Sequence, residues 1–311
     1  MNRRSAPGPR PPALLLPLLL LPLLLLLLAA CGSDSGPGPG PGPGPAPENR
    51  HPSPAPSPTP APADRHPSRV PSAIPAPPAD HWRPHAGTAW QWQLSGTVDT
   101  RVDVPVYDID GFENDAATVA RLHAAGRKVI CYVNAGAWEN FRTDRTAFPA
   151  ALLGSGNGWN GERWLDIRRI DLLRPLMARR FDMCRAKGFD AVEPDLMDAY
   201  TNRTGFPLTA ADQLAYNRML AELAHARGMA VGLKNDLEQI PELVGDFDFA
   251  VSEECAEYGE CDRLTPFIAA DKAVFHAEYA VPTARFCPTA RRLRLSSMLK
   301  HLNLDAWRQP C

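Results

Sequence analysis

The 311-residue sequence predicts an α/β fold, a (β/α)8 TIM barrel, preceded by a signal peptide and a disordered Pro/Gly-rich linker. Of the 34 prolines, 24 fall in residues 1–84. Proline removes a backbone donor and fixes φ, so this part is not expected to contribute a core. The remaining residues are numerous enough for one large domain. Within them, eight short β-like runs are mostly separated by helical segments, which favours parallel strands closed into a barrel.

Residues 1–31 have the organisation of a bacterial lipoprotein signal peptide. Arginines at positions 3, 4 and 10 precede a nearly pure leucine run over 14–28, and the segment ends in the lipobox pattern Leu28-Ala-Ala-Cys31. The apolar run is short and contains two prolines, which favours a cleaved signal over a membrane anchor. We therefore expect Cys31 to carry lipid; a plain secreted protein and a signal anchor are the alternatives.

Residues 32–81 are Gly-Pro and then Pro-Ala-Ser repeats, which predict a disordered tether. The domain at 82–311 would then stand at the outer face of the bacterial cell membrane, or be secreted. We expect no nucleic-acid partner, because the domain carries no basic stripe or nucleic-acid motif. We expect a monomer. Seven Lys/Arg and four Asp/Glu precede residue 85, so the nearly neutral whole chain contains an acidic domain.

The cysteines predict disulfide bonds. If Cys31 carries lipid, six cysteines are left, and an even number in an exported domain indicates disulfides. Among the possible pairings, Cys255–Cys261 is the most local. No Cys-x-x-Cys is present, and the one His-x-x-x-His, from His81 to His85, contains Pro84, so we predict no metal and no other cofactor.

The predicted elements alternate along the domain. Strands are expected at 104–110, 128–133, 164–167, 189–193, 229–233, 247–251, 273–276 and 298–302. Helices are expected at 114–125, 171–187, 210–227, 237–244 and 262–270, with 283–293 as loop or helix. Gly126, Gly188 and Gly228 end three of these helices, a position that glycine favours. No Gly-x-Gly-x-x-Gly follows the first strand, which disfavours a dinucleotide-binding sheet.

Acidic side chains cluster where the predicted strands end, and this is where a (β/α)8 barrel carries its chemistry. A single acid at a strand end is commonly a helix cap, but crowded like charges cost energy, so a convergent set indicates a site for a cationic or polyhydroxy ligand. The densest clusters, 193–198 and 252–255, follow the fourth and sixth strands. Paired carboxylates break glycosidic bonds, and a separation of about 5 Å would give a retaining mechanism.

Seven segments in order resemble glycoside hydrolase family 114: 90–96, 107–110, 129–136, 164–168, 188–195 with 198–200, 232–235, and 252–255 with Tyr258 and Cys261. The resemblance covers essentially the whole domain. It implies an endo-α-1,4-polygalactosaminidase with a (β/α)8 barrel, acting on α-1,4-linked galactosamine-containing polysaccharide. By position it implies Asp195 as nucleophile and Glu253 as acid/base. Glu254 stands where the family commonly has glutamine and is the alternative acid/base; strand alternation should turn only one of the two glutamates to the axis.

An acidic rim would attract a cationic amino-sugar polymer. We expect substrate contacts from Asp108, Asp110, Tyr132, Asn134, Asp166, Glu193, Asp198, Tyr200, Lys234, Asn235, Tyr258 and Glu278. The aromatic residues Trp90, Trp92 and Trp138 either stack on sugars or pack in the core. Two other functions remain open from the sequence: a barrel lyase with a Schiff base on Lys234, and a non-catalytic glycan-binding surface lipoprotein.

Overall fold

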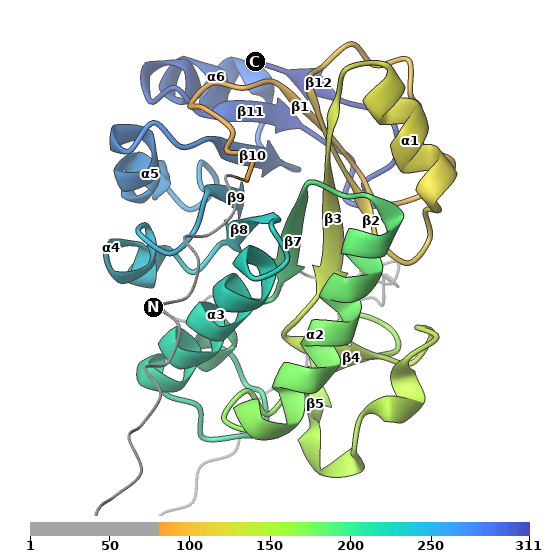
Figure 1. The fold of residues 1–311 in the computed structure, drawn as a ribbon. Helices are drawn as coiled ribbons and strands as arrows, with labels where there is room; N and C mark the ends of the chain where they lie inside the picture. Colours follow the sequence, from red (N-terminus) through yellow and green to blue (C-terminus); the bar gives the residue numbers. More distant parts are fainter. Residues whose placement is uncertain (1–80) are drawn as a thin grey trace, which may run out of the picture. The chain divides into compact units, whose positions relative to one another are not determined.

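The computed structural model describes residues 81–311 (Figure 1). The predicted signal peptide, the lipidation site Cys31 and residues 32–80 of the tether lie outside the described residues. His81, which the sequence places at the end of the tether, is buried and hydrogen-bonds Asp248. Within the described part, no helix has the length and apolar character needed to cross a bilayer.

Eight parallel strands form one curled sheet, as an α/β barrel requires. In sheet order they are β1 (Trp90–Gln93), β2 (Val106–Asp110), β3 (Lys128–Asn134), β7 (Ala191–Asp195), β8 (Ala230–Lys234), β9 (Phe249–Glu253), β10 (Val274–Glu278) and β11 (Ser296–Leu299). A two-residue strand, β12 (Gln309–Pro310), pairs antiparallel with β11. The hydrogen-bonded sheet ends at β1 on one side and at β12 on the other. The indole N–H of Trp90, on β1, donates to the backbone carbonyl of Ser296, on β11, at 2.8 Å, and so links the two sides.

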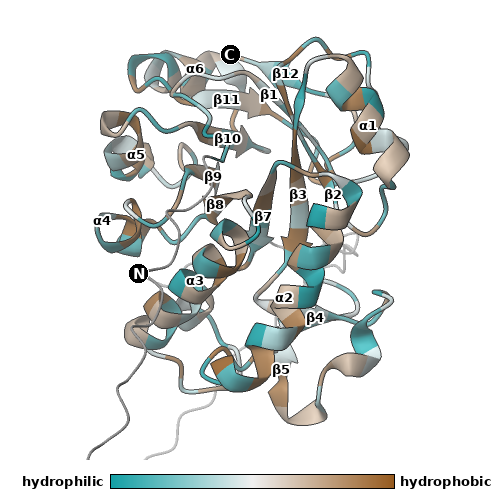
Figure 2. Cartoon of the chain, in the orientation of Figure 1, coloured by the Kyte–Doolittle hydropathy of each residue, from teal (hydrophilic) through white to brown (hydrophobic). Residues whose placement is uncertain are grey.

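Helices on the outside of the sheet connect its strands (Figure 1). They are α1 (Ala116–Ala124), α2 (Ile170–Lys187), α3 (Ala210–His225), α4 (Ile240–Leu243), α5 (Thr265–Ala269) and α6 (Thr283–Arg292). Short 3-10 turns occur at Arg145–Ala147, Ala150–Leu152, Ala199–Thr201, Leu237–Gln239 and Cys261–Leu264. Figure 2 shows both apolar and polar residues along α2 and α3, as expected of helices with one face on the sheet.

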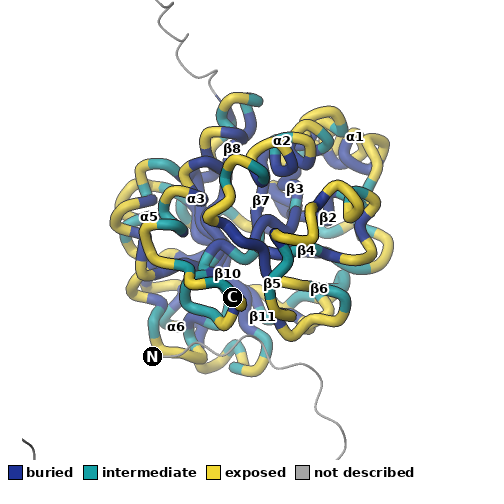
Figure 3. Tube along the Cα trace, turned by 90° about the horizontal axis from the view of Figure 1, so that it is seen from below, coloured by how far each residue is buried: buried dark blue, intermediate teal, exposed yellow. Residues whose placement is uncertain are grey.

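Two apolar clusters form the core. The larger lies between the sheet and the helices, and the smaller fills the inside of the curled sheet. The inner cluster takes residues from all eight parallel strands, among them Trp90, Ile130, Ala191, Val251 and Met298. In Figure 3 the buried strands lie inside a ring of exposed segments. Because side chains alternate along a strand, the residues two or four positions after these inner ones also point inward, and they form the site described below.

The predicted third strand is wrong as a barrel strand. Residues 162–165 form β6 (Glu162–Leu165), the middle strand of a separate antiparallel sheet with β4 (Ala137–Glu139) and β5 (Leu153–Gly156). Joining parallel strands requires a long crossover, and the connection from β3 to β6 contains only strands and short turns. The crossover helix, α2, comes after β6 and leads to β7.

β1 is a further strand that the sequence pattern does not predict, although it lies within the motif at 90–96. Its four residues Trp-Gln-Trp-Gln are all buried. The side-chain amides of Gln91 and Gln93 can be buried because their N–H groups donate to the backbone carbonyls of Ala306 and Thr97, both at 2.9 Å. The extra strand replaces the one lost at β6, so β7 and β9 are the fourth and sixth strands, as predicted.

Three disulfides hold the fold: Cys131–Cys184, Cys255–Cys261 and Cys287–Cys311. They confirm the prediction of disulfides and the local pair at Cys255. The first joins β3 to α2, and the last holds the C-terminal residue against α6. The second closes the turn after β9, which carries residues of the site.

Gly136, just after β3, should be the least replaceable glycine near the site. Its N–H donates to the carbonyl of Asp195 at 3.0 Å, and a Cβ there would lie 2.1 Å from the backbone oxygen of Leu196. Gly136→Ala should therefore lower the free energy of unfolding by about 1–3 kcal/mol, the usual cost of overpacking. Gly245→Ala is the control, because a Cβ there has nothing within 4 Å. Equal urea midpoints for the two variants would contradict the prediction.

Candidate active site

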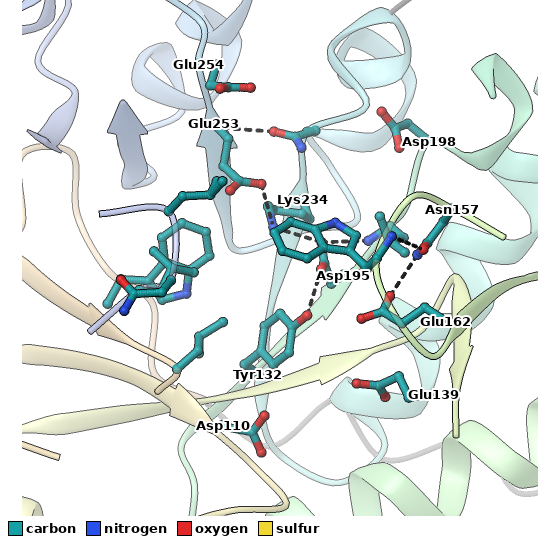
Figure 4. A pocket seen from close by; sticks show the side chains of 18 of the residues that line it. Asp110, Tyr132, Glu139, Asn157, Glu162, Asp195, Asp198, Lys234, Glu253 and Glu254 are labelled. Atoms are coloured by element: carbon teal, nitrogen blue, oxygen red, sulfur yellow. Dashed lines mark hydrogen bonds and ion pairs between the residues drawn. The ribbon is translucent and has the colours of Figure 1, made fainter. Parts of the chain in front are cut away.

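A cavity of about 460 Å³ opens at the carboxyl ends of the barrel strands. Tyr132, Asp195, Lys234 and Glu253 line it from four neighbouring strands, β3, β7, β8 and β9 (Figure 4). Each lies an even number of positions after a residue of the inner core, so alternation turns all four inward. The fold therefore brings together side chains that are far apart in the sequence.

The ammonium group of Lys234 is the centre of this site. Its Nζ lies 2.8 Å from Oδ1 of Asp195, 3.0 Å from Oε2 of Glu253 and 3.5 Å from Oε1 of Glu193. It also lies 5.0 Å from the centre of the Trp92 ring. Burial alone would lower the pKa of Lys234, but the three carboxylates raise it well above its usual range. Lys234 is therefore a permanent cation that offsets the repulsion among the acids.

Hydrogen bonds hold the carboxylate of Asp195 in its ionised form. Tyr132 donates its hydroxyl to Oδ2 at 2.8 Å, and the N–H of Leu196 donates to Oδ1 at 2.8 Å. Burial raises the pKa of Asp195, but Lys234 and these donors outweigh it, and the pKa lies below its usual range. Burial and the Asp195 charge raise the pKa of Tyr132 well above its usual range, so its hydroxyl stays a donor.

Glu253 ends β9 and faces the same cavity. The hydroxyl of Tyr279 donates to its Oε1, while its backbone N–H donates to the side chain of Asn235 at 2.9 Å. Oε2 is the oxygen paired with Lys234. Both carboxylate oxygens of Glu253 are thus oriented by polar partners from the neighbouring strands, β8 and β10.

Glu254 also lines the cavity, although it comes directly after Glu253. Its backbone is left-handed, with φ of 58°, because the strand has ended. Burial, followed by the neighbouring charges of Glu253 and Glu257, raises the pKa of Glu254 to about 7. In Figure 4 its carboxyl lies away from the Lys234 group. Alternation thus turns Glu253 to the barrel axis, and the turn after β9 brings Glu254 to the rim.

The small antiparallel sheet supplies one wall of the cavity. Glu139 and Glu162 are paired directly across β4 and β6, and both line the cavity. Asn157 donates to Glu162 at 2.7 Å, yet burial raises the pKa of Glu162 to about 7. Arg142 lies 2.8 Å from Glu139 and binds both carboxylate oxygens of Asp110, at 3.0 and 2.6 Å. The lining residue Asp110 is thereby held in an ion pair.

The structure places the other predicted binding residues in two groups. Those that line the cavity are Asp110, Tyr132, Asp198, Lys234, Asn235 and Tyr258. Those outside its lining are Asp108, Asn134, Asp166, Glu193, Tyr200 and Glu278. Direct contact of this second group with substrate stays a prediction, but the six residues lie outside the lining of the cavity.

Each residue of the second group has a structural reason for its place. Asp108 and Glu193 lie fully buried, and Asn134 accepts from the N–H of Ala137 at 2.8 Å. The other three are occupied by polar contacts: Asp166 with Arg168, Tyr200 with Glu238, and Glu278 with the N–H of Ala256. Glu278 also directly follows Ala277, whose side chain points into the barrel, so strand alternation turns Glu278 to the helix layer.

Sequence reasoning missed the wall formed by the small sheet and its loops. Phe141, Arg142, Trp159 and Glu162 line the cavity, and Phe141 and Trp159 are about half exposed. A tryptophan inside the Gly/Asn-rich loop at 154–161 was a usable signal, because such a loop cannot bury a large ring. Of the predicted aromatic residues, Trp92 and Tyr258 line the cavity, whereas Trp90 packs in the inner core and Trp138 lies outside the lining.

Two groups of described side chains have the composition of metal ligands. In one, Cys255 and Cys261 form a disulfide, so their sulfurs are not available as thiolates. In the other, His81 and His225 both hydrogen-bond Asp248, at 2.9 and 2.8 Å, just before β9 begins. That group lies at the opposite end of the strands from the cavity and plays no part in it.

The family model for glycoside hydrolase family GH114 matches residues 71–311. The chain belongs to this family. The GH114 match confirms the sequence resemblance, and the protein is a glycoside hydrolase. A crystal structure of Aspergillus fumigatus Ega3 in complex with galactosamine is 40% identical, covers 75% of this chain and 100% of that chain, and has a TM-score of 0.71.

More distant similarities agree with the fold of this GH114 protein. The glycoside hydrolase domain of PelA from Pseudomonas aeruginosa is 14% identical with a TM-score of 0.55, over 71% of this chain and 96% of that chain. An uncharacterized protein of Deinococcus radiodurans is 29% identical over 248 residues, which is 68% of this chain and 79% of the relative.

Replacing the central cation should destabilise the protein in a pH-dependent way. Lys234→Met leaves buried carboxylates without their shared partner, which should cost about 3–5 kcal/mol near pH 7. The low pKa of Asp195 contributes stability above its ordinary pKa that is lost as the pH falls through its folded pKa. In Lys234→Met the buried carboxylates lack this cation and take up protons on folding. The loss in free energy of unfolding relative to the wild type should therefore be smaller at about pH 4 than at about pH 7.

Urea unfolding at both pH values measures this effect. Lys300→Met is the matched control, because Lys300 is equally buried but its Nζ donates to the backbone carbonyls of Asp305 and Trp307, at 2.7 and 2.6 Å. A deficit for Lys234→Met that stays constant with pH would mean that the carboxylates do not depend on its charge.

Proposed function

We propose that the protein is an endo-glycosidase that hydrolyses α-1,4-linked galactosamine-containing polysaccharide by a retaining mechanism. Asp195 is the nucleophile and Glu253 the acid/base. The observation that carries this proposal is the bridging of both carboxylates by Lys234. Because Nζ of Lys234 lies 2.8 and 3.0 Å from the two bridged oxygens, these oxygens are at most about 5.8 Å apart, the sum of the two distances, which is compatible with the roughly 5 Å separation of retaining enzymes.

In the first step, Asp195 attacks the anomeric carbon and the glycosidic C–O bond breaks, while Glu253 gives its proton to the departing oxygen. The low pKa of Asp195 supplies an ionised nucleophile. In the second step, Glu253 takes a proton from water, the water oxygen bonds to the anomeric carbon, and Asp195 leaves as a carboxylate. Lys234 contacts both carboxylates, so it offsets the negative charge on whichever of the two is ionised.

The charge of the cavity supports an amino-sugar substrate. The carboxylates that line it are Asp110, Glu113, Glu139, Glu162, Asp195, Asp198, Glu253, Glu254 and Glu260, whereas the cations are Arg142 and Lys234. Both cations are already paired with acids. A net negative cavity attracts a cationic chain and repels an anionic one. The complex of Ega3 with galactosamine, at 40% identity, is consistent with this substrate class.

The exposed aromatic residues at the cavity support action within a chain. Phe141 and Trp159 lie on the side of the small sheet, and Tyr258 lies on the turn closed by the Cys255–Cys261 disulfide. Rings of this kind stack on sugar faces on either side of the cleaved bond. We further propose that the domain acts outside the cytoplasm, anchored by lipid on Cys31 or secreted, and as a monomer.

The contacts of Lys234 argue against a Schiff-base lyase. A lysine that attacks a carbonyl must lose its proton, and Lys234 is held as an ammonium by three carboxylates. The remaining alternative is a glycan-binding protein without turnover. New reducing ends released from the polymer separate the two cases, since a binder would retain the polymer and release none.

Asp195→Asn and Glu253→Gln should each lower the release of oligosaccharides from partly deacetylated galactosaminogalactan by a factor of about 10³ or more, while circular dichroism shows that both variants remain folded. Glu254→Gln is the matched control: it removes the adjacent carboxylate and should retain most of the turnover. Loss of activity in Glu254→Gln together with activity in Glu253→Gln would assign the proton donor to Glu254, in agreement with its raised pKa.

Substrate charge gives a separate prediction. Turnover should fall steadily as the amines of the polymer are acetylated, and should fall as salt is raised, because both changes weaken attraction to the acidic cavity. Product profiles on galactosaminogalactan, chitosan and their re-acetylated forms measure this. Equal rates on fully acetylated and deacetylated galactosamine polymer would show that the acids do not select for amines.

A further inference from the structure

A second carboxyl pair is buried among the inward-facing residues and has no role in the mechanism above. Asp108 comes from β2 and Glu193 from β7, and both side chains are fully buried. The two carboxyl groups lie close enough for each to shift the pKa of the other. None of their four oxygens accepts a hydrogen bond from an N–H or O–H group elsewhere in residues 81–311. The cation that they contact is Lys234, whose Nζ lies 3.5 Å from Oε1 of Glu193.

This arrangement requires a shared proton. Two adjacent carboxylates without other donors are too costly to bury as a pair of anions, and one proton shared between them relieves the repulsion. Burial, and then the charge of Glu193, raises the pKa of Asp108 well above its usual range. Burial raises the pKa of Glu193 to about 7, although Lys234 opposes the rise. The pair therefore holds at least one proton near neutral pH, and it carries a single negative charge once Glu193 is ionised, above about pH 7.

That single charge completes the surroundings of Lys234. An ammonium group has three N–H donors. Two are directed at Asp195 and Glu253, at 2.8 and 3.0 Å, and Glu193 lies within reach of the third. Without the charge on Glu193, the ammonium would have no buried anion on the side of the barrel interior.

We propose that Asp108 and Glu193 are a proton-sharing positioning pair for the hydrolase. Their one negative charge fixes Lys234 between Asp195 and Glu253, and keeps the local charge balance at which the acid/base holds its proton. Neither residue touches the substrate. The positioning role rests on the roles proposed above for Asp195 and Glu253. The sharing of a proton between Asp108 and Glu193 does not depend on those roles.

The charged and titratable groups that surround the pair come from every neighbouring strand. They are Tyr132 on β3, Asp195 on β7, Lys234 on β8, Glu253 on β9, and Tyr279 directly after β10. Both tyrosines have a pKa well above the usual range and stay neutral. Of the groups named here, Glu193 is the one whose pKa is raised to about 7, so the pair can change the charge around Lys234 near neutral pH.

Removing the charge and removing the shared proton should have different effects. A negative charge beside a catalytic acid favours its protonated form. Glu193→Gln should therefore move the basic limb of the kcat/KM profile down by about one pH unit and lower kcat more than it changes KM. Asp108→Asn keeps a donor to Glu193 and leaves the charge of Glu193 in place, so the basic limb should keep its position.

Infrared difference spectroscopy tests the shared proton without any substrate. The wild type should show the stretch of a protonated carboxyl near pH 8, where Glu162 and Glu254 are largely ionised, and Asp108→Asn should lose it. Glu278→Gln is the matched control, because Glu278 is also fully buried but faces the helix layer. It should keep both the infrared band and the basic limb.

Several outcomes would overturn the proposal. One is the absence of the band in the wild type, and another is its persistence in Asp108→Asn. A third is an equal shift of the basic limb in Asp108→Asn and Glu193→Gln, as expected if both substitutions merely loosened the barrel. If Glu193→Gln does not fold, the infrared comparison of wild type and Asp108→Asn still decides whether the proton is shared. If the protein cleaves no galactosamine polymer, the proposed function fails while the infrared result stands.

Discussion

The ammonium of Lys234, buried at the ends of the central strands, is the interaction on which the site depends. Asp195 and Glu253 come from different strands and carry like charges, so they would repel each other in a buried cavity. Lys234 lies 2.8 and 3.0 Å from them and removes that penalty. The same contact makes the cation permanent, which excludes carbonyl chemistry at this lysine and leaves two carboxylates poised on one cavity. Family GH114 membership and this geometry thus agree on the hydrolysis of a glycosidic bond.

The rest of the fold positions this group. Strand alternation turns Asp195, Lys234 and Glu253 inward, above the apolar residues that fill the curled sheet. Gly136 allows the loop after β3 to pack on the residue following Asp195. The antiparallel sheet inserted before α2 then adds an acidic and aromatic wall. The parallel strands supply the chemistry, while the insert and the disulfide-closed turn after β9 supply much of the surface that a sugar chain would contact.

The sequence was sufficient to predict the α/β class, the disulfides, the family and the acids after the fourth and sixth strands, because periodicity and motifs are local properties. It failed where tertiary pairing decides. Residues 162–165 have strand character, but the missing crossover places them in a separate antiparallel sheet. Trp90–Gln93 is too short and polar to stand out, yet the side-chain amides of its glutamines donate to backbone carbonyls, one of them, that of Ala306, far along the sequence. Asp108 and Glu193 look like rim acids in the sequence, and only the depth of the barrel shows that they are buried.

Trapping of the covalent intermediate tests the central claim, that Lys234 holds Asp195 as the nucleophile opposite Glu253. A 5-fluoro glycosyl fluoride of galactosamine slows the second step, so the sugar should accumulate on the enzyme. Peptide mass spectrometry should then find the added sugar on Asp195, with much less label in Lys234→Met. Label on Glu253 or Glu254, or no label together with products of inverted anomeric configuration, would contradict this account.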